Sequence, residues 1–211
     1  MSNKIASDLE RRFFCAEDLA IETREADSNK TVLRGHAAVF NQLSVDLGGF
    51  REQIAPGAFL DAINQDDIRA LFNHDPNMIL GRKQSGTLRL QEDSHGLLVE
   101  LDIPDTNAGR DLITSIKRGD VNQMSFGFRV KPGGQDWAKD EEGRMIRTLK
   151  KVGLLDVSPV TFPAYPQTDI AVREMRSYLD AINQTNVEDT QKNKNKMLLK
   201  LKLAGRVLST I

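Results

Sequence analysis

The chain offers few side chains that can act as a general base near neutral pH, because its 211 residues include only three histidines. His74 follows the apolar run ALF at 70–72, in the segment NHDP where a strand gives way to a loop. Loops at strand ends often carry catalytic groups, and imidazole exchanges a proton in this pH range. His36 begins an apolar strand and His95 sits in a tight turn, which favours structural or solvent-facing roles. By position alone, His74 is also more often structural than catalytic.

Ser125 is the candidate nucleophile, within the segment QMSFGF at 123–128. In a strand, Met124, Phe126 and Phe128 anchor one side of the backbone, while Ser125 and Gly127 share the other. The glycine leaves space for a substrate beside the serine. A nucleophilic serine needs such a fixed backbone and a histidine within hydrogen-bond reach. Without that histidine, Ser125 is simply a small polar residue on a strand.

Asp156 is the candidate third member, in the segment LLDVSPVTFPA at 154–164. An acidic residue between apolar neighbours is costly to bury unless it is paired, and orienting a catalytic imidazole is one such pairing. A salt bridge to a basic residue is the ordinary alternative. Ser158 and Thr161 are also nucleophile candidates, but Pro159 and Pro163 favour a strand edge or turn where hydroxyls bond to the local backbone.

Composition excludes several classes of partner and cofactor. The 29 lysines and arginines nearly balance 30 aspartates and glutamates, for a net charge of −1, so no overall field attracts nucleic acid or anionic membranes. Cys15 is the single cysteine and cannot form an internal disulfide, and no Cys/His cluster has metal-ligand spacing. We expect no cofactor, no metal, no signal peptide and no membrane span, and therefore a protein that stays inside a cell.

The elements expected to position these side chains are short. Hydrophobic periodicity and turn residues predict an amphipathic helix within residues 2–14, a two-stranded hairpin within 20–40, a short helix within 55–63 and a helix at 107–118. Further strands are predicted at 68–72, 87–91, 97–103, 123–130, 145–149 and 152–157, with a polar loop or hairpin arm after 130.

The pattern divides the chain into four parts. An N-terminal helical arm spans 1–19 and the main domain spans 20–179. A polar flexible linker follows at 180–196, and the chain ends in a basic amphipathic tail at 197–211, too short to cross a bilayer. The tail is typical of a helix that docks on the domain or a partner, with a membrane-surface helix as the alternative.

Three segments resemble the signature blocks of the prohead maturation proteases of tailed bacteriophages, in order and in spacing. They are LFNHDP at 71–76, QMSFGF at 123–128 and DVSPVTFPA at 156–164. The likeness also takes in GHAAVF at 35–40 and IAPGAF at 54–59, so it covers roughly 21–172. Each block alone is weak evidence for the resemblance, and the five blocks in series are strong evidence.

The resemblance implies an α+β fold, with a small, mostly antiparallel β-barrel surrounded by helices, similar to the herpesvirus capsid assembly protease. The domain at 20–179 is then the protease domain. Ser125 matches the family's nucleophile and His74 its base, for acyl transfer by a serine endopeptidase. Asp156 takes the orienting position, where the phage proteins commonly have Glu and the herpesvirus enzymes a second histidine. Arg82 or backbone amides near Ser125 are candidate oxyanion donors, although Arg82 is as easily explained by a surface ion pair.

The resemblance also implies a substrate and a place. The substrate is the major capsid protein or a scaffolding segment, cleaved in the host cell cytoplasm inside the immature capsid, and the protease also cleaves itself. A homo-oligomer is expected. A non-enzymatic capsid-assembly or scaffolding factor is the second hypothesis, and a small hydrolase acting on another substrate, such as an ester, is the third.

Overall fold

The protein is described by a computed structural model at residues 9–15, 19–23, 31–162 and 175–180, and at Lys192 and Lys196. The chain divides into two compact units, residues 1–170 and 171–211. In the second unit, residues 175–180 are helical. Apart from residues 180, 192 and 196, the predicted linker and tail lie outside the described residues, and the four-part division stays a prediction.

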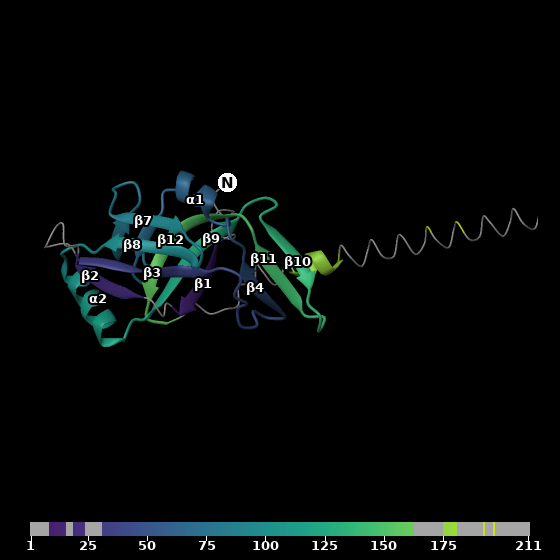
Figure 1. Ribbon diagram of the computed structural model, residues 1–211, viewed down its shortest axis with the longest axis horizontal. Helices are drawn as coiled ribbons and strands as arrows, with labels where there is room; N and C mark the ends of the chain where they lie inside the picture. Colours follow the sequence, from purple (N-terminus) through teal and green to yellow (C-terminus); the bar gives the residue numbers. More distant parts are fainter. Residues whose placement is uncertain are drawn as a thin grey trace, which may run out of the picture. The chain divides into compact units, whose positions relative to one another are not determined.

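The described residues of the first unit form three β-sheets (Figure 1). Hydrogen bonds join β1-β9-β12-β5-β6 in the largest sheet, β2-β3-β8-β7 in the second and β10-β11-β4 in the third. The pairings are antiparallel except for β12 with β5 and β11 with β4. The strands are β1 (Glu10–Cys15), β2 (Ala20–Thr23), β3 (Thr31–Val39), β4 (Phe50–Ile54), β5 (Arg69–Leu71), β6 (Ile79–Arg82), β7 (Leu88–Glu92), β8 (Gly96–Asp102), β9 (Gln123–Val130), β10 (Gln135–Lys139), β11 (Met145–Leu149) and β12 (Val152–Val160).

Two helices, α1 (Leu60–Gln65) and α2 (Asn107–Arg118), accompany the sheets. The bounds of α2 agree with those predicted because its end signals are local. The Thr106 side chain accepts a hydrogen bond from the Gly109 amide, and Gly119 ends the helix at a φ of 82°, in the left-handed region that glycine adopts without strain. α2 packs near β2, while α1 lies against β12 and starts later than the predicted helix.

The hydrophobic core fixes β9 from one side. Met124, Phe126 and Phe128 are almost fully buried. Phe126 meets Phe59 edge to face at 5.4 Å and lies 5.1 Å from Phe128, ring centroid to centroid. The predicted apolar row of this strand is confirmed, and it anchors the backbone that carries Ser125.

The predicted N-terminal helix is wrong at residues 10–14, which belong to strand β1. Helical spacing of Ile5, Leu9 and Phe13 suggested a helix, but Glu10 and Arg12, two residues apart, are both buried in ion pairs with other strands. That alternation suits a strand. Residues 1–8 lie outside the described residues.

Other sequence predictions have mixed outcomes. The mostly antiparallel α+β character and the hairpin of β2 with β3 are confirmed. The polar arm after 130 contains β10, which forms a hairpin with β11, whereas β4 and β6 were not predicted. The described strands form three open sheets, so the predicted closed barrel is not confirmed. Within the described residues, no helix has the length and apolar character needed to cross a membrane.

Candidate active site

His74, Ser125 and Asp156 lie in one continuous hydrogen-bonded chain. His74 Nε2 is 2.7 Å from Ser125 Oγ, and His74 Nδ1 is 2.5 Å from Asp156 Oδ1. Along the sequence, Ser125 lies 51 positions and Asp156 lies 82 positions after His74. The structure thus brings together the three side chains selected from the sequence.

Sheet topology explains this convergence. β12, which carries Asp156, lies between β9, which carries Ser125, and β5. His74 comes three residues after Leu71, the last residue of β5. Because β5 runs parallel to β12, with Asp156 beside Arg69, the chain leaving β5 turns over the end of the sheet next to Ser125.

A β-bulge in β12 sets the side of the sheet on which Asp156 lies. Leu154 pairs with Phe128 and Asp156 with Gly127, so Leu155 is an extra residue in β12. The bulge reverses the alternation, which places Asp156 and Ser158 on the face of Ser125. Bulges often re-aim side chains next to active sites in this way.

Gly127 makes room for the Asp156 carboxylate. A Cβ atom at residue 127 would lie 2.4 Å from Asp156 Oδ2, closer than nonbonded atoms can approach. The prediction that this glycine leaves space for substrate is therefore wrong, since the carboxylate fills that space. The glycine accommodates the Asp156 side chain, which extends from the neighbouring strand β12.

Ser158 is a part of the site that the sequence did not assign. Its hydroxyl donates a 2.7 Å hydrogen bond to Asp156 Oδ1, the oxygen that also faces His74, and the serine is fully buried. Sequence reasoning expected this hydroxyl to bond to local backbone. The spacing of two from Asp156, which puts both side chains on one face of a strand, was the signal that could have revealed it.

The loop that carries His74 is fastened to the end of β12. The Asn73 amide nitrogen Nδ2 donates to Thr161 Oγ1 at 2.9 Å, and the Thr161 backbone amide donates to Asn73 Oδ1 at 2.8 Å. Asn73 and His74 have φ values of 54° and 57°. Two consecutive non-glycine residues in this sparsely populated region need surrounding contacts to hold them, and such strain is common at functional sites.

Burial and polarity decide what the arrangement can do. Ser125 has no exposed surface, and His74 and Asp156 are 8% and 6% exposed. An ionised carboxylate can only accept, so Nδ1 of a neutral His74 carries its proton toward Asp156, and Nε2 is an acceptor that faces Ser125 Oγ. This tautomer can take the serine proton, while the carboxylate stabilises the imidazolium that forms.

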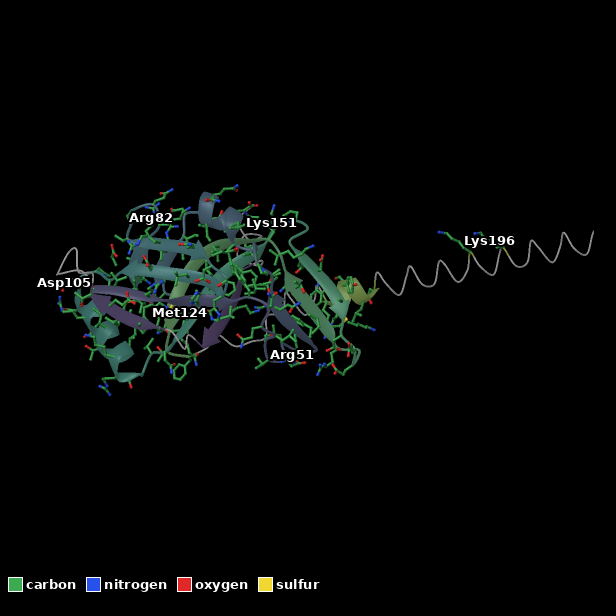
Figure 2. All side chains as sticks on the ribbon, viewed as in Figure 1. Arg51, Arg82, Asp105, Met124, Lys151 and Lys196 are labelled. Atoms are coloured by element: carbon green, nitrogen blue, oxygen red, sulfur yellow. The ribbon has the colours of Figure 1, made fainter. Side chains whose placement is uncertain are left out.

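The remaining candidates lie elsewhere. His36 Nε2 is 2.9 Å from Asp93 Oδ2, and its ring meets that of His95 edge to face at 4.7 Å between centroids. Arg82 is ion-paired with Asp67, with its Nε 2.9 Å from Asp67 Oδ1, so the surface ion pair is the role that the structure supports. Figure 2 labels Arg82 near the upper left edge of the molecule in this view. Among the described residues, no group of three His, Cys, Asp or Glu side chains forms a metal site.

The comparison with protein families decides the family of this chain. The family described as caudovirus prohead serine protease matches residues 17–184. The chain belongs to this family. The predicted resemblance is confirmed, and the chain is a serine protease of capsid maturation.

The chain was also compared with solved structures and with curated proteins. Among solved structures, the capsid assembly protease of bacteriophage T4 aligns with a TM-score of 0.47 at 10% sequence identity, over 72% of this chain and 97% of the T4 chain. No curated protein matches the sequence.

Proposed function

We propose that Ser125, His74 and Asp156 are the catalytic triad of this prohead protease. The observation that carries the proposal is the unbroken chain from Ser125 Oγ through the imidazole to Asp156 Oδ1. His74 removes the serine proton as Ser125 attacks the scissile carbonyl, and then gives that proton to the leaving amine. Water hydrolyses the acyl-enzyme with His74 again acting as base.

Ser158 helps to position this triad in the proposed mechanism. Ser158 and the Nδ1 atom of His74 both bond to Asp156 Oδ1, so the carboxylate is held from two sides. Fixing the carboxylate fixes the imidazole, because a short hydrogen bond joins them. Orientation of this kind lowers the barrier by removing the need to rearrange during the reaction.

We further propose that the substrate is the major capsid protein or its scaffolding segment, and that the protease also cleaves itself. Membership of the prohead protease family supports a capsid-protein substrate. The polar segment at 180–196 has the composition of an exposed linker, which proteases cut readily. Removal of the basic tail at 197–211 is the expected self-cleavage, and mass spectrometry of mature particles would detect an intact C-terminus if the tail stays.

The assembly state and the place of action are parts of the same proposal. We expect a homo-oligomer, made in the host cell cytoplasm and enclosed in the immature capsid. Light scattering of the purified Ser125→Ala protein measures the oligomeric state without interference from self-cleavage.

The catalytic assignment is tested by co-expressing the full chain with its cognate coat protein. Ser125→Ala and His74→Ala should each leave the coat protein uncut, a loss of about 10⁴-fold or more in cleavage rate. Ser94→Ala and His95→Ala are matched controls, because both residues are exposed and neither contacts the triad. Cleavage by either triad variant at the rate of its control contradicts the assignment.

A further inference from the structure

The nucleophile of this protease is covered in the described structure. Ser125 has no exposed surface, and β1 runs antiparallel beside β9 with Phe13 directly opposite Ser125. A peptide bond must come within about 3–3.5 Å of the serine oxygen for attack. No protein substrate can approach a side chain that is enclosed in this way, so part of the structure must move before the enzyme works.

β1 also competes for the proton on which catalysis depends. Ser125 Oγ donates to the backbone carbonyl oxygen of Arg12 at 2.8 Å, while His74 Nε2 lies 2.7 Å away. A hydroxyl has one proton to donate. When that proton points to Arg12, it is not available to the imidazole. β1 therefore blocks both the access of a substrate to Ser125 and the transfer of the serine proton to His74.

A buried ion cluster, made of Glu10, Arg12, Glu52 and Arg147, holds β1 in place. Arg12 Nε is 2.6 Å from Glu52 Oε1, which ties β1 to β4. Arg147 Nη1 is 2.7 Å from Glu10 Oε2, which ties β1 to β11. All four side chains are at most 6% exposed. Apart from these ties, β1 is an edge strand with β9 as its one partner in the sheet.

The ion cluster can separate without leaving an unpaired charge. Within β1, Arg12 Nη2 is 2.8 Å from Glu10 Oε2, and between β4 and β11, Arg147 Nη1 is 2.9 Å from Glu52 Oε2. Departure of β1 therefore divides the cluster into two neutral pairs. Breaking a buried ion pair is most costly when it leaves one charge behind, and this geometry avoids that outcome.

We propose that β1 is an inhibitory strand that keeps the protease latent, and that its release opens the edge of β9 to an extended substrate peptide. The inference rests on the proposed role of Ser125 as nucleophile. A peptide that adds to β9 in the register of β1 brings a backbone carbonyl to Ser125, as Arg12 does, and main-chain hydrogen bonds hold it there. The family match begins at residue 17, after β1, so the inhibitory strand lies outside the region that matches the family.

The first test locks β1 onto β9 in the full chain. Cys15, the single cysteine of the protein, lies opposite Gln123 in the ladder, so Gln123→Cys creates one disulfide partner. Opposed Cβ atoms are about 4.5–5.5 Å apart, close to the span of a disulfide. The probe is a small fluorophosphonate that labels reactive serines. Oxidation should slow labelling of Ser125 about 10-fold or more, because it removes the open population, and reductant should restore the rate.

The matched control for the lock is Cys15→Ser/Gln123→Cys, which has the new thiol but cannot form the disulfide. Its labelling rate should not respond to oxidant or reductant. Mass spectrometry of the oxidised Gln123→Cys protein measures the fraction that is cross-linked, so the rate is assigned to the locked form. Equal labelling of the locked and reduced forms overturns the proposal.

The second test releases β1 and expects the opposite change. Glu10→Gln/Arg12→Gln removes the charges of the two ion-cluster members that lie in β1 and leaves the neutral pair of Glu52 and Arg147. Labelling should become about 10-fold faster because the open state is more populated. Damage to the fold lowers the reactivity of a triad, so a gain separates release from unfolding. Arg89→Gln/Asp102→Asn, which removes an ion pair between β7 and β8, should leave the rate unchanged.

The two tests also separate this proposal from the catalytic assignment. If no form is labelled at Ser125, including the reduced Gln123→Cys protein and the Glu10→Gln/Arg12→Gln variant, the proposed triad is wrong whatever β1 does. If all forms label at Ser125 at one rate, the triad stands and the inhibitory strand is rejected. Slower labelling of the released variant than of the wild type also contradicts the inference.

Discussion

The described residues form two buried polar clusters that differ in what they can do chemically. The proposed catalytic cluster, called the catalytic cluster below, consists of His74, Asp156, Ser125 and Ser158, and the ion cluster consists of Glu10, Arg12, Glu52 and Arg147. Both clusters are buried, and short hydrogen bonds join the members of each. They differ in the mobility of their protons, and that difference separates a site that reacts from one that holds the chain together.

The groups of the catalytic cluster are arranged so that a proton can pass from Ser125 to His74. It contains one imidazole that can exist with one or two protons, between an oxygen that can lose a proton and a carboxylate that stabilises the charged ring. The ion cluster contains two guanidinium groups, which keep their charge at any ordinary pH, and two carboxylates. Its guanidinium groups do not give up a proton, so it cannot relay one, and its contribution is to join β1, β4 and β11.

The largest expected effect is on catalysis through Asp156. Asp156→Asn keeps the shape of the side chain but allows its amide to donate toward His74, which favours the wrong tautomer. We expect kcat for coat-protein cleavage to fall about 10³–10⁴-fold while remaining above that of Ser125→Ala. Asp140→Asn, a change of a half-buried carboxylate in the turn between β10 and β11, is the control. Full activity of Asp156→Asn shows that the carboxylate does not orient the base.

The next effect is on stability through the ion cluster. Arg147→Met removes the arginine that pairs with both Glu10 and Glu52, so two buried carboxylates lose a charged partner. The free energy of unfolding should fall by about 3–5 kcal/mol, measured by urea denaturation. Arg144→Met, which removes an exposed arginine paired with Asp140, should change it by about 1 kcal/mol or less. Similar losses in both variants mean that burial adds nothing to the cluster.

A smaller effect on catalysis is expected from crowding the Asp156 carboxylate. Gly127→Ala introduces a methyl group where Asp156 Oδ2 now lies, and the carboxylate must move away. Misplacement by about 1 Å should lower kcat roughly 10- to 100-fold, with little change in KM. Gly153→Ala is the matched control in β12, since its new Cβ meets neighbours at 3.4 Å or more. Wild-type kcat in Gly127→Ala contradicts the fixed position of the carboxylate.

The smallest effect is the acid sensitivity of the ion cluster. Burial acts to raise the pKa of Glu10, but the hydrogen bonds and charges of Arg147 and Arg12 outweigh it and lower the pKa from its ordinary value of 4.5. A lowered carboxyl pKa stabilises the fold above pH 4.5, and this contribution is lost as the pH falls through the lower value. The free energy of unfolding should therefore drop more steeply in acid for the wild type than for Glu10→Gln/Arg12→Gln. Equal slopes show that Glu10 titrates normally.

Part of the fold and of the candidate site could be predicted from the sequence. Local signals were sufficient for α2 and β9, because a cap, a terminal glycine and an alternating apolar row are properties of neighbouring residues. The segments that contain His74, Ser125 and Asp156 were also visible, since their residue types and order resemble the prohead proteases. The sequence by itself therefore determined which side chains to consider.

Only the tertiary structure decided how those side chains meet. Leu155 bulges because β12 must match β9, and the bulge alone turns Asp156 toward His74 and away from the core. The N-terminal segment becomes β1 because Arg12 and Glu10 find partners 40 and 137 positions away, which outweighs the local helical spacing. Register and long-range ion pairs depend on what the rest of the chain places alongside, so no local pattern can specify them.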